Sequence, residues 1–192
     1  MTINSSIIPK YLVVIGILTM LVACDEGQEP QSGTSTSPPP AAMVTQPSDP
    51  LAPRYEATFA EGIDFRRPGY PNFVAEVAGM SGYETWGRWT EGDKAVFRFR
   101  QPLPREFTLL ITADAFGPNI GQPITVKVGS NEQVFIIKEE GKTYRLPFKL
   151  EEAGSSVEIY VPKPASPLEL RVPNNSDPRK LGVGLVSMKI EG

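Results

Sequence analysis

Apolar and polar residues alternate in short runs along most of the chain beyond Arg54. The clearest runs cover residues 95–99, 107–114, 124–128, 144–150 and 157–161. A repeat of two places every second side chain on one face, which is typical of a half-buried β-strand. Turn-forming Gly, Pro and Asn residues separate the runs. No segment beyond Cys24 keeps a helical repeat over about 11 residues without a Gly or Pro.

This spacing predicts one all-β domain over residues 54–192. Strands that recur about every ten residues, with turns between them, indicate an antiparallel β-sandwich of jelly-roll-like type. The length of the region fits about nine or ten strands in two packed sheets. We find no internal repeat and no second domain boundary in this region.

Residues 1–23 have a different pattern, that of a lipoprotein signal peptide. A short polar stretch ending at Lys10 precedes the almost wholly apolar residues 11–22. A helix needs about 20 apolar residues to cross a bilayer, so this run is too short to span one. It suits the apolar core of a secretory signal. An uncleaved N-terminal anchor is the alternative.

Residues 21–24, Leu-Val-Ala-Cys, resemble the bacterial lipobox. The resemblance implies diacylglycerol on the sulfur of Cys24, cleavage after residue 23 and a fatty-acylated new N-terminus. Several acyl chains hold a protein on a membrane, whereas a single chain binds only weakly. Cys24 is the only cysteine, which excludes an intramolecular disulfide and leaves a free thiol as the alternative. Asp25 resembles the enterobacterial signal for the periplasmic face of the inner membrane, with the outer membrane as the other location.

Residues 24–53 are predicted to form a lipidated, disordered linker. They contain Pro38-Pro39-Pro40, clusters of Ser, Thr, Gly and Gln, and almost no large apolar residue. A segment of this composition cannot bury enough surface to fold, and its prolines make it partly extended. We interpret it as a spacer that holds the domain away from the membrane; an unselected disordered segment is the alternative.

Charge and composition exclude several classes of function. Cleavage removes Lys10 from the 19 basic residues, which leaves 18 against 22 acidic ones and a net charge of −4. Phosphate backbones require clustered Lys and Arg, so we expect no nucleic-acid partner. The chain has no histidine, which excludes Ser-His-Asp catalysis and the usual zinc sites. No Asp-x-Asp-x-Asp run marks a calcium site, and we expect no metal and no cofactor.

The densest group of candidate binding residues lies in residues 82–90. Both tryptophans of the protein are here, and the candidates are Tyr83, Glu84, Trp86, Arg88 and Trp89. An indole face packs against the C–H face of a sugar, while Arg and Glu hydrogen-bond to its hydroxyls. The structural alternative is that the tryptophans cap the core and that Arg88 pairs with a carboxylate.

Three further candidates lie in turns. Asp177 and Arg179 precede the last expected strand; they either contact a ligand or form an ion pair that fixes their loop against the tryptophan segment. Asn119 can hydrogen-bond to a sugar, although the sequence Gly117-Pro118-Asn119 is also explained as a turn. The basic pair Arg66-Arg67 is expected to be solvated.

Several motifs together resemble one known family. They are Gly62-Ile63-Asp64-Phe65 with Arg67-Pro68-Gly69, residues 79–89 with Glu84-x-Trp86-Gly87-Arg88-Trp89, Phe116-Gly117-Pro118-Asn119, and Asp177-Pro178-Arg179-Lys180-Leu181-Gly182. The region from Arg54 to Gly192 resembles a domain of unknown function at the C-terminal end of phosphoglycerol-transferase-like membrane proteins. The resemblance implies a jelly-roll module associated with envelope-glycan or phosphoglycerol chemistry. It does not imply a transferase, because the catalytic and membrane-spanning parts are absent.

Three functions are compatible with these observations. The first is a non-catalytic lipoprotein module that binds, or assists the processing of, an envelope glycan or phosphoglycerol-decorated polymer. The second is a structural or protein-interaction lipoprotein that docks onto a membrane glycosyl- or phosphoglycerol transferase. The third is a hydrolase using two carboxylates such as Glu84 and Asp177, which glycosidases place about 5 to 9.5 Å apart. Nothing in the sequence spacing selects that pair.

Overall fold

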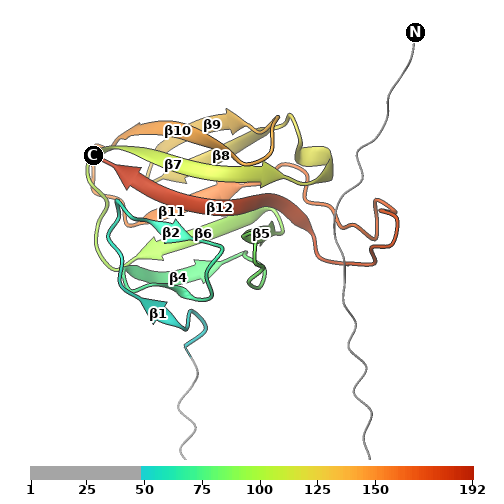
Figure 1. The fold of residues 1–192 in the computed structure, drawn as a ribbon. Helices are drawn as coiled ribbons and strands as arrows, with labels where there is room; N and C mark the ends of the chain where they lie inside the picture. The colour runs from blue at the N-terminus through green and yellow to red at the C-terminus, as the bar shows by residue number, and fades with distance from the viewer. Residues whose placement is uncertain (1–48) are drawn as a thin grey trace, which may run out of the picture. The chain divides into compact units, whose positions relative to one another are not determined.

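Residues 49–192 are described by a computed structural model of the protein, shown in Figure 1. The signal peptide, the lipidation of Cys24 and nearly all of the predicted linker lie outside these residues, and they stay predictions. Within the described part of the chain, we find no helix with the length and apolar character needed to span a bilayer.

Two five-stranded sheets form the domain (Figure 1). In the first, called the β12 sheet, the strand order is β10–β7–β12–β2, and β5 also pairs with β12. In the second, called the β11 sheet, the order is β4–β6–β11–β8–β9. All pairs in both sheets are antiparallel, and only the short ribbon β1–β3 is parallel.

The bounds of the strands follow the alternating runs closely. The β12 sheet contains β2 (Ile63–Asp64), β5 (Arg88–Glu91), β7 (Glu106–Ala115), β10 (Lys142–Lys149) and β12 (Leu181–Glu191). The β11 sheet contains β4 (Val74–Ala78), β6 (Lys94–Phe99), β8 (Pro123–Val128), β9 (Asn131–Ile136) and β11 (Ser156–Tyr160). The ribbon joins β1 (Arg54–Tyr55) to β3 (Tyr70–Pro71), and a 3-10 turn, η1 (Gly117–Asn119), follows β7.

The core lies between the two sheets and is built from one face of each strand. Ile111 of β7 and Ile159 of β11 have no exposed surface, and neither does Phe97 of β6. Phe97 packs edge-on against Phe65, with ring centroids 5.6 Å apart. Burial of these alternate positions removes apolar surface from water and stabilises the sandwich. The predicted all-β, antiparallel, jelly-roll-like sandwich is confirmed.

The structure has more strands than the sequence indicates. Twelve are present in the described residues, against the nine or ten expected. Three of the strands, β1, β2 and β3, have two residues each, too few to show a repeat. Strand β9 has exposed apolar residues, Val134 and Ile136, on the face opposite buried Phe135. Its apolar residues therefore lie on both faces, and the alternation that marks a half-buried strand is missing.

One end of the sandwich brings together two segments that are distant in sequence. Residues 79–87 lead into β5, and residues 161–180 connect β11 to β12. The second segment is joined to the sheet where Ala165 and Leu181 exchange two backbone hydrogen bonds. Figure 1 shows it extending beyond the strands near β5 and the start of β12. The two loops that carry most of the candidate residues thus meet at this end.

Candidate functional site

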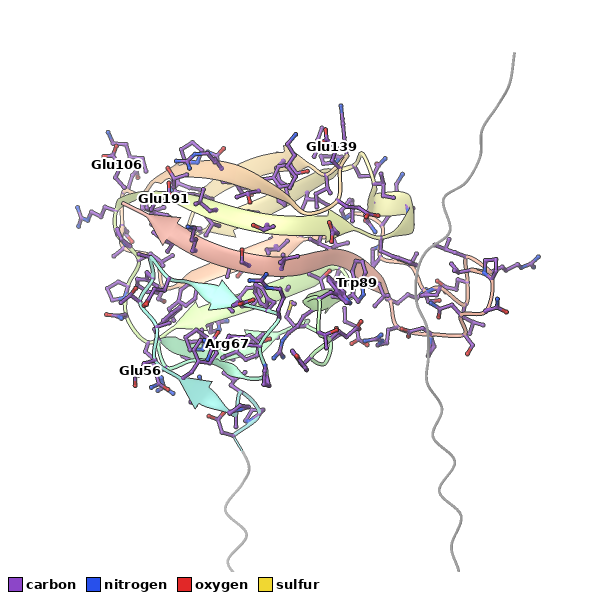
Figure 2. The ribbon with its side chains drawn as sticks, viewed as in Figure 1. Glu56, Arg67, Trp89, Glu106, Glu139 and Glu191 are labelled. Carbon is purple, nitrogen blue, oxygen red and sulfur yellow. The ribbon has the colours of Figure 1, made fainter. Side chains whose placement is uncertain are left out.

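A cluster of three aromatic side chains lies on the outer face of the β12 sheet. Trp89 of β5 pairs in register with Gly184 of β12, which pairs in turn with Asp114 of β7. The rings of Trp86 and Trp89 are 4.8 Å apart at 59°, and Phe116 lies 5.8 Å from Trp89. All three are half-buried. We call this group the aromatic ledge, and Figure 2 shows Trp89 beside β5 and β12.

The ledge depends on the absence of a side chain at Gly184. A Cβ at this position would lie 2.8 Å from Cη2 of Trp86 and 2.9 Å from Cζ3 of Trp89. Both indoles therefore rest directly on the backbone of β12. Because interiors are close-packed and side chains occupy rotamer wells, this contact fixes the orientation of the two rings.

A chain of polar contacts links the ledge to the β11–β12 connection. Nε1 of Trp86 donates a hydrogen bond of 2.8 Å to Glu84. The guanidinium of Arg179 lies 3.3 Å from Glu84 and 2.6 Å from Asp177, and the backbone N–H of Arg179 also donates to Asp177. We call Glu84, Asp177 and Arg179 the clamp. It joins the tryptophan segment to a loop 95 residues away in sequence.

The contact between Arg179 and Asp177 favours the ionised form of both side chains. The hydrogen bonds from Arg179 hold the pKa of Asp177 below its usual range, and the same contact raises the pKa of Arg179. The side chains of Arg179, Glu84 and Asp177 are still 36%, 34% and 21% exposed. Water screens such pairs, so the clamp orients the loop more than it stabilises the fold.

Arg88 has a different environment from its neighbours in sequence. It pairs in register with Leu185, a core residue, and so points to the inner side of the sheet. It is only 8% exposed. Among the described residues, no carboxylate forms an ion pair with it, so the expected carboxylate partner is not found. Nη2 donates instead to the backbone oxygens of Arg67 and Gly69, both at 3.2 Å.

Asn119 requires a correction. Its side chain is fully buried, and Nδ2 donates to the backbone oxygens of Phe116 and Lys163 at 3.1 and 2.8 Å. Its Oδ1 accepts from the N–H of Lys163 at 3.0 Å. These bonds satisfy both ends of the amide inside the domain. The proposed sugar contact at Asn119 is therefore replaced by a structural role, in which it joins η1 to the β11–β12 connection.

The structure thus divides the sequence candidates into groups. Trp86 and Trp89 form the ledge, and Glu84, Asp177 and Arg179 form the clamp beside it. Arg88 and Tyr83 lie together on another side of β5, with the guanidinium 5.9 Å from the Tyr83 ring. The ion pair between Asp177 and Arg179, one of the two alternatives considered, is present.

Sequence reasoning missed three residues of this region. Phe116 completes the ledge, Gly184 supports it, and Tyr70 stacks under Arg88 with its ring centroid 4.5 Å from the guanidinium carbon. A signal existed for the first, since Phe116 directly precedes the Gly-Pro-Asn turn. The alternation of Gly182 and Gly184 in a buried strand was a weaker signal, because glycine in a strand often marks close approach of another group.

The fold and this region define a β-sandwich module with an aromatic surface cluster. Residues 51–192 match the family model described as "Domain of unknown function (DUF7024)", and the chain belongs to this family. This match, together with the relatives that follow, confirms the resemblance to the domain associated with phosphoglycerol transferases.

Several curated proteins are similar to this chain. Phosphoglycerol transferase I of Citrobacter koseri and that of Salmonella arizonae are each 39% identical over 134 residues. The protein of the same name from Escherichia fergusonii is 37% identical. Each match covers 68% of this chain but 17% of the relative. The chain therefore spans a small part of the length of these proteins.

Similar solved structures include family 29 carbohydrate-binding modules. One is a variant of CBM29-2 complexed with mannohexaose, with a TM-score of 0.47 and 10% identity over 68% of this chain and 90% of that one. Another is a family 29 module with a TM-score of 0.43 and 12% identity over 68% of this chain and 87% of that one.

The close contact at Gly184 leads to the first prediction. We expect Gly184→Ala to lower the free energy of unfolding by about 1–3 kcal/mol, the usual cost of overpacking, and to change the tryptophan fluorescence. Gly82→Ala is the matched control, since no atom other than those of Gly82 and its two chain neighbours lies within 4 Å of the added Cβ. Urea unfolding followed by fluorescence measures both. Equal effects of the two substitutions would contradict this role for Gly184.

The clamp leads to a prediction about acid. Because folding lowers the pKa of Asp177, its contribution to stability is complete above the ordinary value of 3.8 and is lost as pH falls through the folded-state pKa. Asp177→Asn removes this contribution at every pH. The melting temperature of this variant should therefore fall less steeply than that of the wild type between about pH 4 and pH 2.

Thermal melts over this range measure the difference. Glu152→Gln is the control, since Glu152 is exposed and makes no ion pair with the described residues. Parallel curves for the wild type and the Asp177→Asn variant would show that the clamp does not depend on the charge of Asp177.

Proposed function

We propose that the protein is a non-catalytic, membrane-tethered module that binds an envelope glycan or a phosphoglycerol-decorated polymer at the aromatic ledge. The observation that carries this proposal is the rigid packing of two half-buried tryptophans on Gly184. Rigid aromatic faces offer a large contact area at little entropic cost, and a few fixed polar groups supply orientation. Glu84 and Arg179 stand beside the rings and supply such groups.

The chemistry of the same region supports binding rather than catalysis. A glycosidase needs one protonated carboxyl group and a second carboxylate. Here Glu84 and Asp177 both contact Arg179, and the lowered pKa of Asp177 opposes a role as proton donor near neutral pH. The relatives named phosphoglycerol transferase I suggest a setting in envelope phosphoglycerol chemistry. The match covers 17% of the length of these relatives, and we propose that the matched domain assists such chemistry.

The lipid anchor completes the proposal. A lipidated Cys24 and the linker of residues 24–53 would hold the domain at the periplasmic face of the inner membrane, or of the outer membrane. We expect Cys24→Ser to move the protein from the membrane fraction to the soluble fraction of its host. Intact-mass measurement of the native protein tests the same point. A mass that retains residue 1 and lacks acyl chains would contradict the anchor.

Binding at the ledge is tested by affinity electrophoresis of the full-length protein through gels containing envelope glucans. We expect Trp86→Ala and Trp89→Ala each to lower the affinity for the glucan, measured from its retardation, by about tenfold or more. Truncating an aromatic anchor costs about 2 kcal/mol of binding free energy. Tyr160→Ala is the matched control, a half-buried aromatic of the β11 sheet. If no glucan or envelope polysaccharide retards the wild type, the proposal fails.

A second function, docking onto a membrane glycosyl- or phosphoglycerol transferase, is favoured by a separate observation. Leu168 and Leu170 of the β11–β12 connection are 54% and 45% exposed, and Ile120 beside η1 is 57% exposed. Exposed apolar residues in one region are typical of interaction surfaces. In a pull-down with the transferase, loss of capture by Leu168→Ser and Leu170→Ser, with unchanged glucan binding, would favour docking. Capture that depends on the tryptophans would instead place both partners at the ledge.

A further inference from the structure

Arg88 is a buried positive charge that lacks a negative partner among the described residues. It is 8% exposed, and it makes no ion pair with a described carboxylate. An arginine stays protonated in a protein, so burial cannot be relieved by loss of the proton. Burying an unpaired charge is costly, and buried charges are normally paired. The site therefore holds a positive charge that a bound anion would compensate.

The surrounding groups compensate this charge only in part. Two backbone oxygens, of Arg67 and Gly69, accept from Nη2. The ring of Tyr70 lies 4.5 Å from the guanidinium carbon and that of Tyr83 lies 5.9 Å away, both within reach of a cation–π interaction. These contacts leave Nε buried with no hydrogen-bond partner in the described residues. Such unsatisfied groups are rare in native interiors, and a bound ligand is one arrangement that would satisfy this one.

One terminal nitrogen of the guanidinium makes no hydrogen bond to the described residues. Within residues 49–192, both hydrogen bonds of the guanidinium come from Nη2, and Nη1 makes none. Tyr83, whose ring lies 5.9 Å from the guanidinium carbon, is 43% exposed. The guanidinium therefore lies beside a partly exposed aromatic ring, which is the side from which a ligand would approach it.

A second guanidinium lies in the neighbouring loop. Arg67, whose backbone oxygen binds Arg88, places its own exposed side chain 4.1 Å over the ring of Tyr55. Figure 2 labels Arg67 in the loop between β2 and β3. The carboxylate at the end of β2, Asp64, forms an ion pair with Arg66 at 2.8 Å. The local charge around Arg67 and Arg88 is therefore positive in a protein whose net charge is negative.

We propose that Arg88, Arg67 and Tyr83 recognise the phosphate diester of a phosphoglycerol group carried by a glycan. This inference rests on the proposed function and names the substituent that the domain reads. A phosphate oxygen suits the planar guanidinium fork, and the exposed ring of Tyr83 offers a face to the adjoining glycerol or sugar. Tyr83 directly precedes Glu84 of the clamp, so the two regions are neighbours along the chain.

The test compares an unsubstituted envelope glucan with the same glucan bearing phosphoglycerol groups, using the full-length protein in detergent. We expect the substituted glucan to bind about tenfold more tightly, the effect of one charge-assisted hydrogen bond. The preference should shrink as salt rises from about 0.01 to about 0.15 M. Glycerol 1-phosphate should compete for the substituted glucan and not for the unsubstituted one.

Variants assign the preference to these residues. Arg88→Lys keeps the charge and loses the planar fork, so the preference should fall toward equal binding while affinity for the unsubstituted glucan is kept. Arg67→Gln and Tyr83→Ala change exposed residues, so they test the same preference if the Arg88 variant does not fold. Arg105→Gln is the matched control, an exposed arginine between β6 and β7 without an ion pair to the described residues.

The outcomes separate the two proposals. Equal binding of both glucans by the wild type overturns this inference and leaves the glycan-binding function standing. A preference that survives in the Arg67→Gln and Tyr83→Ala variants, or is lost in Arg105→Gln, also overturns it. If neither glucan binds but glycerol 1-phosphate does, with dependence on Arg67, the anion site stands and the glycan-binding function fails.

Discussion

The pairing of β12 is the interaction on which the remaining features depend. This last strand pairs with β7 along one edge and with β5 and β2 along the other. Its inward residues, such as Leu185, form the centre of the core, and its outward Gly184 carries the two indoles. Without this strand β5 loses its hydrogen-bonding partner in the sheet, and the aromatic ledge loses its support.

Two arginines in different electrostatic environments, Arg179 and Arg88, lie on opposite sides of β5. In the clamp, Arg179 forms ion pairs with two partly exposed carboxylates, and these ion pairs hold two loops together. Arg88 is buried and compensated only by carbonyl oxygens and aromatic rings. Paired surface charges contribute little net energy, whereas a buried unpaired charge is maintained against its desolvation cost. The first arrangement is a positioning device, and the second has the features expected of a recognition site.

Some of the candidate site was predictable from residue types. The group Trp86, Arg88 and Trp89 was recognised because it concentrates large aromatic and charged residues in a short segment. Its internal division was not visible, because neighbouring residues in a strand point to opposite faces and only the register with β12 shows which face is which. For Asn119 the same residue type suits a ligand contact and a buried turn, and the hydrogen bonds to Lys163 settle its role.

Local patterns were sufficient for the sandwich. A period of two within β6, β7, β8, β10 and β11 predicts half-buried strands, since alternation reports directly which side chains leave water. The order of the strands, the contact of the indoles with Gly184 and the isolation of Arg88 came instead from the three-dimensional arrangement. Each of these features depends on residues that are far apart in the chain, as Glu84 and Arg179 are. A sequence periodicity contains no information about such partners, because it describes only how a segment divides its own side chains between two faces.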